Sequence, residues 1–174
     1  MIDGSARTAF DIVQALDDPN LFGPWFSGPS WAVWKSVLKA AFCIPMDEGE
    51  VKLFRGVAER DPPKRRVREL WAIVGRRGGK DSVASGIACF AAGFVDYKKV
   101  LRPGERASVL CLAVDKAQAS IVEKYTRAYF ADVPLLRGQV TRETADGLLL
   151  KTGPSLTFWP PTFAMFVAAA SPAW

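Results

Sequence analysis

A glycine-rich stretch with a lysine, VGRRGGKDS from Val74 to Ser82, contains the residue types that bind phosphate groups. It follows an apolar segment, Leu70 to Val74, of the kind that forms a buried strand, and it precedes a segment typical of an apolar helix. Glycines let backbone N–H groups approach phosphate oxygens, and the helix adds its positive end. The lysine then reaches the outer phosphates, and a neighbouring hydroxyl holds Mg²⁺. The stretch therefore predicts a nucleotide-binding loop.

Eight consecutive residues make up the predicted site: Gly75, Arg76, Arg77, Gly78, Gly79, Lys80, Asp81 and Ser82. Lys80 is the expected phosphate ligand. Arg76 and Arg77 could stabilise charge in the transition state or neutralise a triphosphate. Asp81 or Ser82 would hold Mg²⁺, because hard cations accept oxygen ligands.

Two positions depart from the general pattern G-x-x-x-x-G-K-[ST]. The first glycine slot holds Val74, and Gly75 comes one residue later. The hydroxyl slot holds Asp81, which could either ligate Mg²⁺ or repel the phosphates. Ser82 follows, but one residue along a helix turns it by roughly 100° from the ligand. A glycine turn that binds no ligand therefore stays an alternative.

The elements that would position this loop alternate between strands and helices. We expect strands at Leu70–Val74 and Ala107–Val114, and helices from Lys80 to about Phe94 and from an Asp115 cap to about Phe130. This order predicts an α/β domain with a parallel sheet, in which the apolar run Ala107–Val114 is buried on both faces. A hairpin is expected to follow, with Gln139–Thr144 pairing with Leu148–Lys151 across an Asp-Gly turn.

The first 63 residues predict a helical, aromatic arm. Helices are expected at Ala6–Leu16, from an N-cap at Ser30 to Phe42, and at Glu48–Arg60, where prolines follow. The aromatic residues between Phe22 and Trp31 are expected to pack onto the core, and a stacking surface is the alternative. Residues 64–151 would then be the core domain.

Charge and composition limit the possible functions. Between Arg55 and Lys80 there are nine Lys or Arg against three acids, which suits a polyanion; a solvated basic face is the alternative. The absence of histidine excludes Ser-His or Cys-His catalysis and His-based metal sites. Three isolated cysteines argue against a disulfide framework and favour a reduced, cytosolic setting. We expect no signal peptide and no membrane span.

Residues 152–174 differ from the rest of the chain. They contain no charged residue and four of the 12 prolines, together with aromatic side chains such as Phe163, Phe166 and Trp174. Neither helical nor strand periodicity is clear. We therefore expect this segment to be a separate, aberrant tail.

The ordered set of motifs resembles one protein family. "ELWAIVGRRGGKDS", with Arg76 inside the loop, is similar to the Walker A motif of the large terminase subunit of tailed bacteriophages and prophages. The resemblance extends upstream through "DPNLFGPWFSGPSWAVWKSVLKAAFCIPM" and "DEGEVKLFRGVAERDPP". Downstream it continues through "RASVLCLAVDKAQASIVEKYTRAYF", so that it covers about residues 15 to 150.

The resemblance implies a P-loop NTPase of the RecA-like (ASCE) kind, with helices on both faces of its sheet. It implies an ATPase that packages double-stranded viral DNA in a bacterial host cell, together with a small terminase subunit and a portal ring. Lys80 would bind the β- and γ-phosphates of ATP, Arg76 would be the arginine of the loop, and Asp81 or Ser82 would hold Mg²⁺. Gln118 lies in the segment after the second strand, and its role stays open.

The sequence departs from this family after Leu150. The family next has a Walker B strand ending in Asp-Glu, and then a nuclease domain with an acidic cluster. Residues 152–174 contain no acid. We therefore expect a truncated chain that binds Mg-ATP weakly and hydrolyses it poorly, and we hypothesise that this segment is out of frame or degenerate. The alternatives are a basic nucleic-acid-binding fragment and an inert remnant of a broken prophage gene.

Overall fold

A computed structural model describes residues 10–97, 101–113, 116–145, 147–151, 154–159 and 167–170. These residues form two compact units, here called the N-terminal unit, Phe10–Gly78, and the C-terminal unit, which begins at Gly79. The division differs from the expected boundary after residue 63. One reason is that the segment after residue 63 is attached to the N-terminal helices, since Val67 N–H donates to the Ala41 carbonyl at 2.9 Å.

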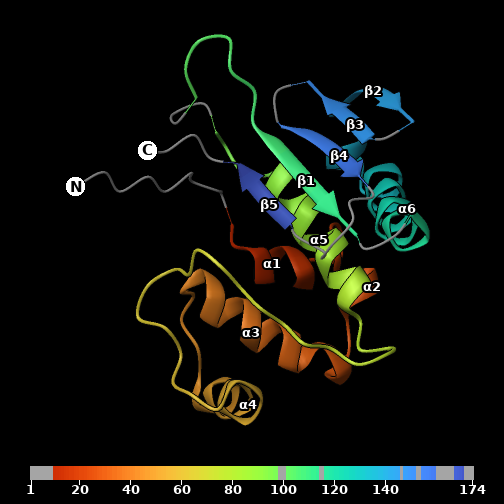
Figure 1. Cartoon of the computed structure of the whole chain (residues 1–174). Helices are drawn as coiled ribbons and strands as arrows, with labels where there is room; N and C mark the ends of the chain where they lie inside the picture. Colours follow the sequence, from red (N-terminus) through yellow and green to blue (C-terminus); the bar gives the residue numbers. More distant parts are fainter. Residues whose placement is uncertain are drawn as a thin grey trace. The chain divides into compact units, whose positions relative to one another are not determined.

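The N-terminal unit is helical, as the sequence predicts. Its elements are α1 (Ile12–Asp17), α2 (Gly23–Phe26), a 3₁₀ turn (Pro29–Trp31), α3 (Ala32–Phe42) and α4 (Glu48–Ala58) (Figure 1). Capping boxes at Asp11 and Asp47 satisfy the first N–H groups of α1 and α4. The expected cap Ser30 is wrong, because this residue lies inside the 3₁₀ turn and α3 begins after Trp31.

Aromatic side chains build the core of this unit. Phe22 and Phe26 are almost completely buried, and the ring of Phe26 lies 4.8 Å from that of Trp31 at a tilt of 58°. Burial of an aromatic side chain contributes roughly 1.5–3 kcal/mol. The packing interpretation is therefore confirmed for Phe22 and Phe26, and these two rings are not a stacking surface.

The C-terminal unit combines helices with a sheet. Its elements are α5 (Lys80–Gly93), β1 (Ser108–Leu112), α6 (Lys116–Asp132), α7 (Pro134–Arg137), β2 (Val140–Thr144), β3 (Gly147–Leu150), β4 (Ser155–Trp159) and β5 (Val167–Ala170). The strand order is β2-β3-β4-β1-β5. The mixed α/β prediction is confirmed, and so is the hairpin, which β2 and β3 form.

The predicted parallel sheet is found only in part. Among the described strands, β1 and β4 run parallel, whereas the pairs β2–β3, β3–β4 and β1–β5 are antiparallel. The expected burial of β1 on both faces is also wrong, because buried and half-buried positions alternate along it. Among the described helices, α5 and α6 pack against each other and both contact β1 and β4 (Figure 1). They therefore cover the same face of the sheet, not both faces.

The covered face is formed by alternate residues of the parallel pair. The register places Val109 beside Leu156 and Cys111 beside Phe158, and all four side chains are buried. Neighbours in register point to the same side of a sheet. These four residues thus form one apolar layer, which positions α5 and, with it, the residues at the start of that helix.

The expected strand at Leu70–Val74 is absent. These residues adopt no regular structure and belong to the N-terminal unit. The side chains of Leu70 and Trp71 are 44% and 75% exposed, and Ile73 is fully exposed. An apolar run predicts a strand but does not specify which strand it pairs with. The described elements of this unit are all helical, so they offer this segment no strand to pair with. The edge of β1 is paired with β5 instead.

Substitution of Ile73 by serine distinguishes an exposed, irregular segment at Leu70–Val74 from the buried strand that the sequence predicts there. The exposed side chain loses no packing, so the free energy of unfolding should change by about 0.5 kcal/mol or less. A buried strand residue would cost about 2–5 kcal/mol when its apolar side chain is removed. Urea unfolding of Ile73→Ser beside wild type measures the difference, and a loss in the larger range would contradict the exposed placement.

Part of the expected aberrant tail belongs to the sheet. Ser155–Trp159 forms β4, which lies between β3 and β1. Leu156 and Phe158 are buried, and Thr157 between them is half-buried. The aromatic residues Phe163, Phe166 and Trp174 lie outside the described residues, as does the expected cap Asp115. None of the helices within the described ranges combines the length and the apolar character that crossing a bilayer requires.

Candidate functional site

The first half of the predicted loop is a tight turn at the end of the N-terminal unit. The N–H of Gly78 donates to the carbonyl of Gly75 at 3.2 Å, and Arg77 has a left-handed φ of 64°. A Cβ at Gly78 would lie 2.3 Å from Val74 Cγ1, so the close approach requires glycine. The side chains of Arg76 and Arg77 are exposed.

Trp34 of α3 holds this turn in place. Its indole Nε1–H donates to the carbonyl oxygen of Gly78 at 2.7 Å. Sequence reasoning missed this role of Trp34, because 44 residues separate the partners and no local pattern signals a contact of that range. The tryptophan orients the last peptide group before the second half of the loop.

The second half of the loop begins helix α5. Gly79 is the N-cap residue in a left-handed conformation, with φ of 76°, and no side chain caps the helix. The first backbone bond of the helix runs from Val83 N–H to the Gly79 carbonyl at 3.0 Å. The N–H groups of Lys80, Asp81 and Ser82 therefore have no partner within the helix, which is the arrangement that attracts anions.

Lys80 and Asp81 form an ion pair at this helix start. Lys80 Nζ lies 3.4 Å from Asp81 Oδ2, and the two side chains are 40% and 28% exposed. Asp81 therefore compensates part of the positive charge of Lys80, and a phosphate would need this charge for binding. An incoming phosphate must either displace this carboxylate or bind beside it through a cation.

Ser82 interacts with Tyr129 of α6. Burial and, to a lesser extent, Cys89 and Tyr125 raise the pKa of Tyr129, and Ser82 acts on this pKa in the opposite direction. Ser82 therefore contributes to the contact between α5 and α6. Nothing in the sequence around Ser82 signals Tyr129 as its partner.

The eight predicted site residues are divided between the two units. Gly75, Arg76, Arg77 and Gly78 end the N-terminal unit, and Gly79, Lys80, Asp81 and Ser82 begin the C-terminal unit. The part that carries Lys80, the expected phosphate ligand, is the start of α5. Within the described residues, no group of three or more carboxylate or cysteine side chains could hold a metal ion.

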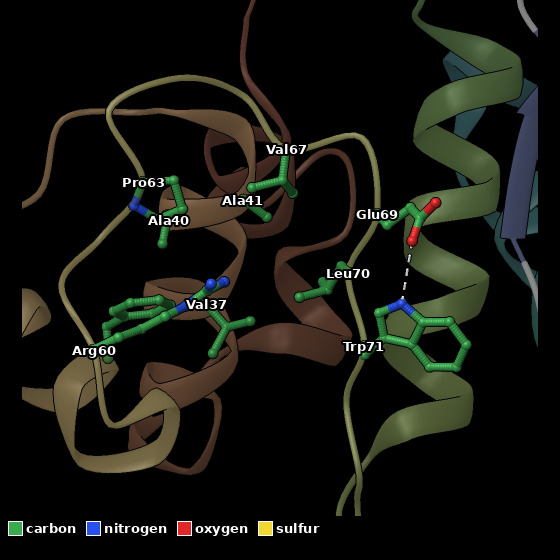
Figure 2. Close-up of a pocket in the computed structure, with 10 residues that line it drawn as sticks. Val37, Ala40, Ala41, Arg60, Pro63, Val67, Glu69, Leu70 and Trp71 are labelled. Atoms are coloured by element: carbon green, nitrogen blue, oxygen red, sulfur yellow. Dashed lines mark hydrogen bonds between the residues drawn. The ribbon is translucent and has the colours of Figure 1, made fainter.

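A cavity of about 400 Å³ lies elsewhere, within the N-terminal unit. Figure 2 shows its lining, which combines apolar residues of α3 with the segment that follows α4. The lining residues are Val37, Ala40, Ala41, Phe54, Arg60, Pro63, Val67, Glu69, Leu70 and Trp71. No residue of the predicted loop contributes to it, so this cavity is separate from the candidate site.

Two buried thiols belong to the contact between α5 and the apolar layer that supports it: Cys89 lies on α5, and Cys111 is part of the layer. Burial raises the pKa of Cys111 to about 12, and burial together with the charge of Cys111 raises the pKa of Cys89. Cys43 in the N-terminal unit is exposed. None of the three forms a disulfide, in agreement with the sequence prediction.

These thiols predict a loss of stability in alkaline solution. Above about pH 8.5 the unfolded chain loses the thiol proton that folded Cys111 keeps, so the folded state binds more protons and stability falls as the pH rises. The loss is about 1.4 kcal/mol per pH unit and ends near pH 12, the folded-state pKa. Urea unfolding of Cys111→Ala under reducing conditions between pH 8 and 10 should show a shallower decline than wild type. Cys43→Ala should not, and equal slopes in all three proteins would contradict the burial effect.

No protein-family model, curated protein or solved structure matches this chain.

Proposed function

We propose that the chain is the N-terminal ATPase portion of a terminase-like DNA-packaging protein, and that it binds Mg-ATP at the start of α5. The observation that supports this is local. A left-handed Gly79 without a side-chain cap is followed at once by Lys80, so unpaired helix N–H groups and a lysine converge on one position. The glycine and lysine spacing of the loop and its similarity to the terminase Walker A motif select a nucleotide among the possible anions.

The same residues predict weak binding. Lys80 already pairs with Asp81, so part of the positive charge that a phosphate needs is compensated before Mg-ATP binds. The resemblance also leads us to expect slow hydrolysis, since the carboxylate that activates water in that family follows the matched segment and residues 152–174 contain none. By the same resemblance, double-stranded DNA would be the polymer moved, and a small terminase subunit and a portal ring would be the partners.

Replacement of Lys80 by alanine tests the position of the site. Wild type should melt at a higher temperature with millimolar Mg-ATP than without it, because a ligand that binds only the folded state stabilises it. Lys80→Ala should lose this shift while keeping its melting temperature without nucleotide. Lys124→Ala removes a comparable exposed lysine from α6 and should keep the shift. If Lys80→Ala keeps the ATP-induced shift in melting temperature, this loop is excluded as the site. If wild type shows no cooperative thermal unfolding at all, the inert-fragment alternative is favoured.

Replacement of Asp81 by serine should act in the opposite direction. The change removes a negative charge beside Lys80 and restores the hydroxyl of the general motif. Removing one repulsive charge from a phosphate site is expected to tighten Mg-ATP binding about tenfold, or about 1.4 kcal/mol. Fluorescence titration with a labelled ATP analogue measures the change, and weaker binding would show that Asp81 itself ligates Mg²⁺.

A further inference from the structure

A basic loop in the N-terminal unit, Lys64–Arg68, is fixed to α3 at two points. The N–H of Val67 donates to the Ala41 carbonyl at 2.9 Å. The guanidinium of Arg66 lies over the ring of Phe42, 4.7 Å from its centroid. A cation over an aromatic ring contributes roughly 0.5–1 kcal/mol at an exposed site. The loop therefore has a defined position, although it contains four positive charges in five residues.

The remaining charges of this loop are not neutralised within the described residues. Lys64, Arg65 and Arg68 are exposed, and no ion pair of the described chain involves them. The two nearest acids for which partners are recorded do not pair with these side chains. Asp61 accepts from Arg55 at 2.7 Å, and Glu69 accepts from the indole of Trp71 at 3.3 Å. Like charges held this closely repel one another, and a polyanion relieves that repulsion.

A large aromatic side chain follows three residues after the loop. Trp71 is 75% exposed, and Figure 2 shows its indole directed away from the apolar lining of the cavity formed by residues such as Val37 and Leu70. Exposed aromatic rings beside cations are what single-stranded nucleic acids require, because bases stack on the ring while the cations contact phosphates. In a duplex the base faces are already stacked and are not accessible to such a ring.

We propose that Lys64–Arg68 and Trp71 bind a single-stranded nucleic acid, with the loop on its phosphodiester backbone and the indole on one base. This interaction is independent of the proposed nucleotide site, since it uses residues of the N-terminal unit only. Four phosphate contacts predict that the logarithm of the binding constant falls with that of salt concentration with a slope of about −3.

Fluorescence anisotropy of a fluorescein-labelled 15-nucleotide oligo(dT), titrated with the full 174-residue chain at several salt concentrations, tests the proposal. The double variant Arg65→Gln, Arg68→Gln should bind about tenfold more weakly, with a slope of about −1.5. Trp71→Ala should also lose about tenfold in affinity but keep the slope, because it removes stacking and no charge. All of these side chains are exposed, so the thermal melts should be unchanged.

Two control variants separate this surface from general charge and from the nucleotide site. Lys52→Gln combined with Lys124→Gln removes the same number of exposed positive charges and should change the affinity about twofold or less. Lys80→Ala should bind the oligonucleotide as wild type does, whether or not it binds ATP. Loss of oligonucleotide binding in either control would overturn the assignment to this loop.

Competing polyanions complete the test. A 15-base-pair duplex should bind more weakly than oligo(dT) and should be insensitive to Trp71→Ala. Tighter binding of the duplex, or equal binding that Trp71→Ala does not affect, would overturn the single-strand assignment. Binding to phosphatidylserine vesicles or polyglutamate with no binding to oligo(dT) would overturn the nucleic-acid assignment.

Discussion

Replacement of Gly147 by alanine is expected to lower the free energy of unfolding by about 3 kcal/mol, a large share of the roughly 5–15 kcal/mol of a typical domain. A Cβ at Gly147 would lie 1.9 Å from the carbonyl oxygen of Leu156 and 3.0 Å from its carbonyl carbon. Both are backbone atoms of the neighbouring strand β4, which cannot turn aside as a flexible side chain can. The backbones of β3 and β4 would have to separate where they pair, at Gly147 with Thr157 and Leu148 with Leu156.

Gly138→Ala is the matched control for this substitution. Gly138 lies in the same unit with a right-handed φ of −65°, and the nearest atom to its added Cβ is the Pro134 carbonyl oxygen at 4.0 Å. Alanine there should be neutral or stabilise by up to about 1 kcal/mol, since it restricts the unfolded chain. Urea unfolding followed by circular dichroism compares the two. Equal stability of Gly147→Ala and Gly138→Ala would contradict the close approach of β3 and β4.

Replacement of Leu156 by alanine is expected to cost about 2–5 kcal/mol. Leu156 is 1% exposed and lies beside Val109 in the parallel register of β1 and β4. Removal of its side chain would leave a cavity in the apolar layer beneath α5 and α6. The expected loss is large because β4 lies between two other strands, where the surrounding structure has little freedom to collapse.

Thr157→Ala, one residue along the same strand, controls for the change in strand propensity. Thr157 is half-buried, and its replacement should cost less than about 1 kcal/mol. Thermal and urea unfolding of both variants measures the difference between them. If Leu156→Ala is as stable as wild type, the segment after Leu150 is not part of the sheet, and its interpretation as an aberrant tail stands.

The effects of Gly147→Ala and Leu156→Ala are not independent. Gly147 and Leu156 meet at one contact between β3 and β4, so the effects of the two single variants should not add in the double variant. The contact also gives Gly147 a second role. From the sequence it is a turn residue of the Asp-Gly pair, whereas the structure shows that the strand pairing itself requires the absence of a Cβ at this position.

The candidate site could be predicted in part. The glycine at the helix start and the lysine after it were identified from their spacing, and α5 does begin at Lys80. Three features could not be predicted: the hydrogen bond from Trp34 to Gly78, the effect of Ser82 on Tyr129, and the ion pair between Lys80 and Asp81. The first two join residues that are distant in the chain. The third depends on rotamers that a sequence pattern does not specify.

Local signals in the sequence determined the helices and the hairpin. Asp47 with Glu50 specifies the start of α4, because their side chains satisfy backbone N–H groups only three residues away. The strands β2 and β3 follow each other closely in the chain and pair antiparallel, as a hairpin requires. Only the tertiary structure decided which apolar runs became strands of the sheet. Leu70–Val74 has the stronger strand pattern but stays outside, while Ser155–Trp159 pairs with β1 and β3. Pairing between strands that are tens of residues apart depends on which sheet edge is available and on the helices that cover the sheet. The amino acids of the strand segment alone specify neither of these.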